Sequence, residues 1–99
     1  MSDLQSQMYA AMGEALRARQ KKRDAAEALR ARQHEYETAS LRGRQQQINR
    51  ARVAVEAAEA AYQAAKRDLQ RLDDKVEEIV QAQLRAAYMY FGGSASVCP

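Results

Sequence analysis

Residues 41–79 read LRGRQQQINRARVAVEAAEAAYQAAKRDLQRLDDKVEEI. Large apolar residues recur here every seven positions, and a second row of mostly small residues lies between them. The first row is Leu41, Ile48, Val55, Tyr62, Leu69 and Val76, and the second is Ala51, Ala58, Ala65, Leu72, Ile79 and Ala86. Two interleaved rows at this spacing form one apolar stripe on an α-helix, and a stripe sustained over five heptads requires a partner helix to cover it. We therefore predict a coiled-coil helix. Its packing seam, the stripe of residues that contacts the partner, is carried mainly by Leu41, Ile48, Val55, Tyr62, Leu69, Leu72, Val76 and Ile79.

The composition predicts an all-α fold. Ala, Arg, Gln and Glu dominate the 99 residues, which include only one Pro and four Gly. This composition is typical of long helices, and no window alternates apolar and polar residues as a strand would. A chain of this length forms at most one small domain and buries only a modest core on its own.

The packing register changes near residue 40. Upstream, one row contains Met8, Ala15, Lys22, Leu29 and Tyr36, and the other contains Leu4, Ala11, Ala18, Ala25, Arg32 and Ala39. The first row would next reach Gly43, but the downstream row starts at Leu41, a slip of two residues. A continuous coiled coil absorbs insertions of three or four residues, so this slip favours an interruption.

We therefore predict a helical hairpin with four segments. They are a first helix over residues 1–38, a turn or register break at 39–43, a second helix over 44–91, and a flexible or docking tail at 92–99 that leaves the helix. One continuous long helix is the alternative, because a lone glycine costs only about 1 kcal/mol in a helix interior.

Alanine at 51, 58 and 65 allows two helices to approach closely, but it contributes little apolar area. Since burial stabilises by about 25 cal/mol per Å², a hairpin built on such residues is marginal alone. We expect it to pack in an oligomeric bundle, with other copies of itself or with a larger protein assembly.

Arginine is concentrated in the first half of the chain. The heptapeptide EALRARQ occurs at 14–20 and 27–33, and residues 17–52 hold 11 basic and four acidic side chains, a net charge of +7. The candidate polyanion-binding residues are Arg17, Arg19, Arg30, Arg32, Arg42, Arg44, Arg50 and Arg52. These arginines could neutralise nucleic-acid phosphates without reading bases. Alternatively, the basic half pairs with the acidic second half across the hairpin or between subunits.

The sequence predicts no catalytic, cofactor or metal site, and we expect a protein that is not an enzyme. His34 and Cys98 are the single histidine and the single cysteine, and no Gly-rich phosphate loop is present. No segment approaches the roughly 20 apolar residues of a membrane span. The N-terminus lacks the basic and apolar regions of a signal peptide, so a cytoplasmic or virion-interior location is expected.

The end of the second predicted helix carries the dense aromatic sequence Tyr88, Met89, Tyr90 and Phe91, a candidate docking end. Together these features predict a non-enzymatic structural or assembly subunit of a larger complex, such as a phage virion or a secretion-type machine. Two alternatives remain. One is a nucleic-acid-associated basic helical protein, and the other is a small adaptor or inhibitor that docks a helix onto a host protein.

Overall fold

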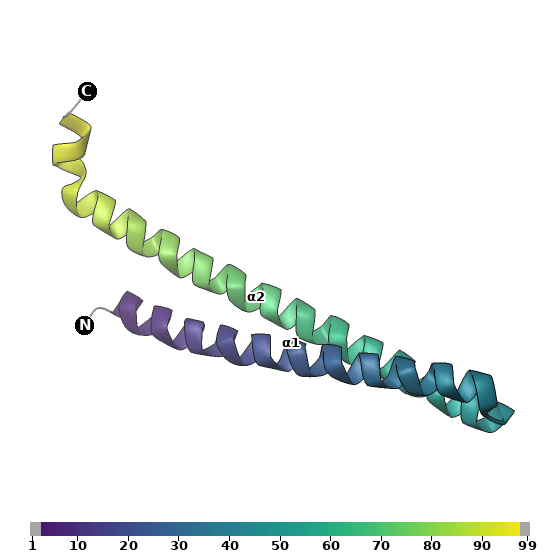
Figure 1. Ribbon diagram of the computed structural model, residues 1–99. Helices are drawn as coiled ribbons and strands as arrows, with labels where there is room; N and C mark the ends of the chain where they lie inside the picture. The colour runs from purple at the N-terminus through teal and green to yellow at the C-terminus, as the bar shows by residue number, and fades with distance from the viewer. Residues whose placement is uncertain (1–2, 98–99) are drawn as a thin grey trace.

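Two antiparallel helices make up the computed structural model, which describes residues 3–97, with side chains placed through Met89. Helix α1 spans Asp3–Arg42 and α2 spans Gln45–Val97, and the chain reverses at Gly43 and Arg44 (Figure 1). The predicted all-α helical hairpin is confirmed. We call the end with the reversal the turn end, and the opposite end, where α1 begins, the open end.

The hairpin is elongated. Its radius of gyration is 22.5 Å, whereas a compact domain of this length would have about 13 Å. Its principal extents are 76 × 30 × 13 Å, so its smallest extent is little more than the thickness of a single helix with its side chains. In the described part of the chain, only the line of contact between the two helices can therefore bury apolar groups.

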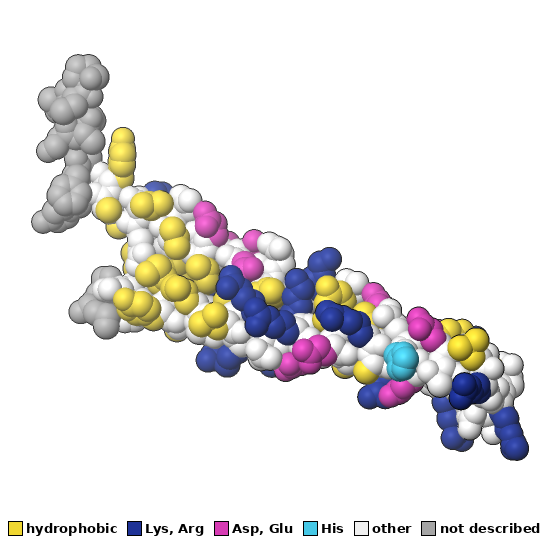
Figure 2. All heavy atoms as spheres, in the orientation of Figure 1, with side chains coloured by type: hydrophobic (Ala, Val, Ile, Leu, Met, Phe, Trp, Pro, Cys, Tyr) yellow, Lys and Arg dark blue, Asp and Glu magenta, His cyan; other side chains and the backbone are white. Residues whose placement is uncertain are grey.

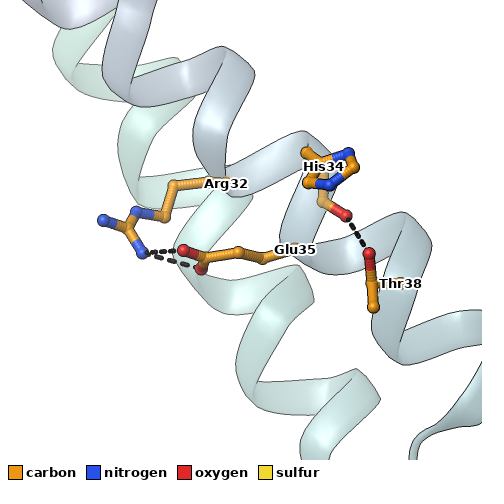
Figure 3. A network of polar contacts seen from close by, with 4 residues as sticks. All are labelled: Arg32, His34, Glu35 and Thr38. Atoms are coloured by element: carbon orange, nitrogen blue, oxygen red, sulfur yellow. Dashed lines mark hydrogen bonds and ion pairs between the residues drawn. The ribbon is translucent and has the colours of Figure 1, made fainter.

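Helix α1 ends four residues later than the sequence predicted. The Thr38 hydroxyl donates a hydrogen bond to the carbonyl oxygen of His34, at 3.0 Å, inside the helix (Figure 3). On the adjacent turn Arg32 binds both carboxylate oxygens of Glu35, at 2.7 and 2.8 Å. Local bonding of this kind satisfies polar side chains without interrupting the helix. The predicted break at 39–43 is thus confined to residues 43–44.

The reversal depends on glycine and on a glutamine cap. The Gly43 N–H donates to the Ala39 carbonyl as the last bond of the α1 pattern. A Cβ on Gly43 would lie 2.6 Å from that same oxygen, so any larger residue would collide with the helix backbone. The Arg44 N–H donates to Oε1 of Gln47 at 3.1 Å. A side chain three positions into α2 therefore caps the helix start, as in half of a capping box.

The core is small and rich in alanine. Among the described residues the buried hydrophobic side chains are Ala11, Ala15, Ala18, Leu29, Leu72 and Ile79. Ala15, Ala18 and Leu72 form one cluster, with Leu69 and Val76 packed against it. The alanines of α1 allow the larger aliphatic residues of α2 to approach closely. This core lies nearer the open end of the hairpin than the turn end.

The packing positions of α2 from Ile48 to Ile79 are buried or half-buried, but Leu41 is 85% exposed. Leu41 lies in the last turn of α1, before the reversal, and so cannot continue the row that α2 presents to α1. Its inclusion in the seam was wrong because the downstream heptad was extended backwards through the turn.

Helix α2 has 53 residues and α1 has 40, so α2 projects past the start of α1 at the open end (Figure 1). The backbone stays helical to Val97 instead of leaving the helix at Gly92 as predicted. Glycine weakens a helix but retains its N–H donor, whereas the proline that cannot donate comes only at Pro99. Residues 98–99 of the predicted tail lie outside the described chain.

Neither α1 nor the described part of α2 is long and apolar enough to cross a membrane.

Candidate interaction surfaces

Within the described residues, no three His, Cys, Asp or Glu side chains come together to hold a metal ion. His34 is exposed on α1, and the acidic side chains of α2 are interleaved with basic and amide groups. Gln70 donates to Asp74 and Gln81 donates to Glu77, at 2.9 and 3.0 Å. The surface features that remain are one apolar region and one basic region, at opposite ends of the hairpin.

Large hydrophobic side chains are exposed near the open end. We define the open-end patch as Tyr9, Met12, Leu16, Leu84, Tyr88 and Met89, whose exposed fractions range from 46% to 82%. Figure 2 shows hydrophobic side chains gathered over both helices on this half of the visible face. If a side chain of this size offers roughly 200 Å², the six expose on the order of 700 Å².

The α1 part of the patch is one stripe next to the seam. Tyr9, Met12 and Leu16 are spaced by three and four residues, so they share a face of the helix. Met12 and Leu16 line a shallow groove of about 160 Å³ between the helices, together with Ala15, Arg19, Asp73 and Val76. The groove therefore has apolar walls and is closed on the turn side by charged groups.

The α2 part of the patch lies on the projecting segment. Leu84 and Tyr88 are one helical turn apart, and with Arg85 and Met89 they form a second apolar surface. The predicted docking end is thus exposed at Tyr88 and Met89, at 69% and 82%. The side chains of Tyr90 and Phe91 lie outside the described residues.

The α1 contribution to this patch was not predicted from the sequence. The signal was present in the three- and four-residue spacing of Tyr9, Met12 and Leu16, immediately beside the predicted packing rows. It was not recognised because these three residues and the adjacent packing rows together form one broad apolar face. Only the hairpin geometry shows that α2 covers the neighbouring row and leaves this one exposed.

The predicted polyanion-binding arginines separate into two groups. Arg42 ends α1, Arg44 lies in the turn, and Arg50 and Arg52 lie near the start of α2. All four side chains are exposed, and none forms an ion pair with any described carboxylate. We call these four residues the turn-end cluster, and basic side chains are visible at this end in Figure 2.

Arg17, Arg19, Arg30 and Arg32 lie instead along the stem of α1, among acidic groups. Arg19 pairs with Asp73 of α2 at 3.8 Å, and Arg32 pairs with Glu35 at 2.7 Å. Arg17 shares a groove with Glu14 and Asp68. The structure therefore brings the two halves of the predicted basic region into different electrostatic surroundings.

Comparison with protein-family models, curated proteins and solved structures finds no significant match to this chain.

Proposed function

We propose that this chain is a non-enzymatic structural or assembly subunit that packs through its open end into a multi-subunit complex. The observation that carries the proposal is the open-end patch, an apolar surface that the described residues of the hairpin leave exposed. Its roughly 700 Å² compares with about 800 Å² per partner in a standard protein interface. Monomeric soluble proteins rarely expose contiguous apolar patches larger than a few hundred Å².

The energetics of the core favour the same conclusion. The buried cluster consists of two alanines and one leucine, with partial burial of Leu69 and Val76. Because folding stability is a small difference between large terms, so little buried apolar area leaves the isolated hairpin marginal. Association through the open-end patch would add the missing apolar burial and stabilise the folded state.

The architecture suits a spacer or strut. A rod 76 Å long, with an apolar docking end and a charged stem, can connect parts of a particle without enclosing a site of its own. A phage virion or a secretion-type machine is the kind of assembly we propose. This setting rests on fold-level analogy.

The test compares two variants in the cells that produce the protein. Leu16→Asp combined with Leu84→Asp places two carboxylates in the open-end patch, at positions that are exposed in the hairpin. Leu41→Asp is the matched control, because Leu41 is also a large exposed leucine but lies at the turn end. Tagged proteins are captured after nuclease treatment, and the bound proteins are quantified by mass spectrometry alongside light scattering of the purified chain.

We expect the wild type and Leu41→Asp to retain the same oligomer or the same protein partners, and the patch variant to lose them. A buried unpaired carboxylate in such an interface weakens binding strongly. The proposal is wrong if the wild type is a monomer without partners after nuclease treatment, or if the patch variant retains every partner. A single stoichiometric host protein held by a monomeric chain would indicate an adaptor instead.

A further inference from the structure

The net positive charge of this protein lies at its turn end. Between Glu37 and Glu56 the sequence contains four arginines and no acidic residue, so residues 38–55 carry +4. Because the whole chain carries +3, all the other residues together carry −1. A rod with balanced charge along its stem and an uncompensated basic end has a directed electrostatic field, which attracts polyanions to that end.

Two arginines of the stem have their charge compensated by a nearby carboxylate. Arg19 faces Asp73 across the hairpin, and Arg32 is bound by Glu35. The four arginines of the turn-end cluster are exposed and form no such ion pair with any carboxylate of the described residues. Charge pairing within the hairpin therefore accounts for part of the stem but not for the turn end.

The residues between these arginines add hydrogen-bond donors. Gln46 and Asn49 are exposed around the start of α2, where their amide N–H groups can donate to anionic oxygens, and Gln45 donates to Oδ1 of Asn49 at 3.0 Å. Arginine offers a planar pair of N–H groups that matches two oxygens of a phosphate, a geometry that lysine lacks. The turn end contains four arginines and no lysine.

We propose that the turn-end cluster binds the phosphodiester backbone of nucleic acid without reading its base sequence. Phosphate contacts of this kind fix position and carry no sequence information. Residues 38–55 include no aromatic side chain that could stack on a base, so binding depends on backbone charge and on salt. This activity is independent of the open-end patch and would allow one hairpin to connect a protein assembly to nucleic acid.

The experiment measures binding of the full chain to a short labelled DNA duplex of arbitrary sequence by fluorescence anisotropy over a series of salt concentrations. Each phosphate contact contributes about −0.9 to the slope of log K against log salt, so four arginines predict a slope near −3.6. Affinity should then fall on the order of 100-fold between about 50 and 200 mM salt.

Two quadruple variants distinguish the effect of the turn-end arginines on binding from the effect of the total positive charge of the chain. The first changes Arg42, Arg44, Arg50 and Arg52 to Gln. The second changes the exposed, unpaired stem residues Lys21, Arg23, Lys66 and Arg67 to Gln, which removes the same charge. Glutamine is nearly as good a helix former as arginine, so both variants should keep the helical circular dichroism of the wild type. We expect the turn-end variant to bind at least about tenfold more weakly and the stem variant to stay within about threefold of the wild type.

Three outcomes would overturn the proposal. They are a wild type that does not bind DNA at low salt, a stem variant that loses as much affinity as the turn-end variant, and tighter binding to phosphatidylserine vesicles or polyglutamate than to DNA. The salt slope of the wild type requires no variant, so the proposal can be tested even if a quadruple variant fails to fold. Since the turn-end variant keeps the open-end patch, it should retain the protein partners of the proposed assembly.

Discussion

Arg19 on α1 and Asp73 on α2 form an ion pair across the hairpin, with 3.8 Å between Nη2 and Oδ1. It is the one ion pair between the helices in the described part of the chain. Both residues also line the groove that holds Met12 and Leu16, so the pair marks where the apolar open end gives way to the charged stem.

This ion pair should contribute little to stability. Arg19 and Asp73 are 57% and 44% exposed, and exposed pairs are typically worth less than about 1 kcal/mol because water and salt screen them. A double-mutant cycle with Arg19→Gln and Asp73→Asn, measured by urea unfolding, should give a coupling energy below about 1 kcal/mol. A coupling above about 2 kcal/mol would show that the pair determines the helix pairing instead of only marking it.

Leu72 should contribute far more to the free energy of unfolding than a leucine of the open-end patch does. Leu72 is 5% exposed and belongs to the central cluster, whereas Leu84 is 57% exposed. Leu72→Ala should lower the free energy of unfolding by about 2 kcal/mol or more, because it removes buried area and leaves a cavity. Leu84→Ala in dilute, unassociated protein should change it by less than about 0.5 kcal/mol. If urea unfolding showed that both variants lower the free energy of unfolding equally, Leu72 would not lie at the centre of the core.

Ala18 should not tolerate a larger side chain. It is 3% exposed and packs with Leu72, so the close approach of the helices depends on its single methyl group. Ala18→Leu should destabilise the hairpin by about 1–3 kcal/mol through overpacking. Ala28→Leu, at an exposed position of the same helix, is the control and should be nearly neutral. A neutral Ala18→Leu would show that the helices can separate without cost.

Much of this hairpin follows from the sequence, because heptad spacing reports directly which residues face a partner helix. In α1 the predicted positions Met8, Ala15, Lys22, Leu29 and Tyr36 are all buried or half-buried. In the other row Arg32 is the exception, since its guanidinium is bound by Glu35 on the surface. The spacing could not identify the partner helix, and therefore could not show that Arg19 would lie opposite Asp73.

The ends of the helices were harder to predict because local bonding decides them. The cap of α2 uses the Gln47 side chain and the backbone N–H of Arg44, a local contact that heptad spacing does not report. The division of the arginines into a partly paired stem and an unpaired turn end likewise depends on where the chain reverses. A reversal a few residues earlier or later would have moved Arg42 or Arg50 along the stem.

Replacing Gly43 and Gly13 with alanine should change the stability of the hairpin in opposite directions. A Cβ on Gly43 would lie 2.6 Å from the Ala39 carbonyl oxygen, but a Cβ on Gly13 would meet only the flexible end of Arg17, at 3.7 Å. Gly43→Ala should therefore destabilise the turn, by about 1–3 kcal/mol. Gly13→Ala should stabilise α1 by about 0.5–1 kcal/mol, because alanine is the better helix former. Thermal unfolding followed by circular dichroism compares them, and stabilisation by both would mean that the turn adapts freely.

The thermal stability of the wild type should depend on its concentration. If apolar burial at the open-end patch joins copies of the chain, mass action stabilises the folded state as concentration rises, by about 2.7 kcal/mol at 100 times Kd. The midpoint of unfolding should rise with protein concentration in the wild type and in Leu41→Asp. It should stay constant in the variant carrying both Leu16→Asp and Leu84→Asp, whose patch is charged. A constant midpoint in the wild type would instead assign the patch to a different protein, because a surface filled by another chain gives no stabilisation when that chain is absent.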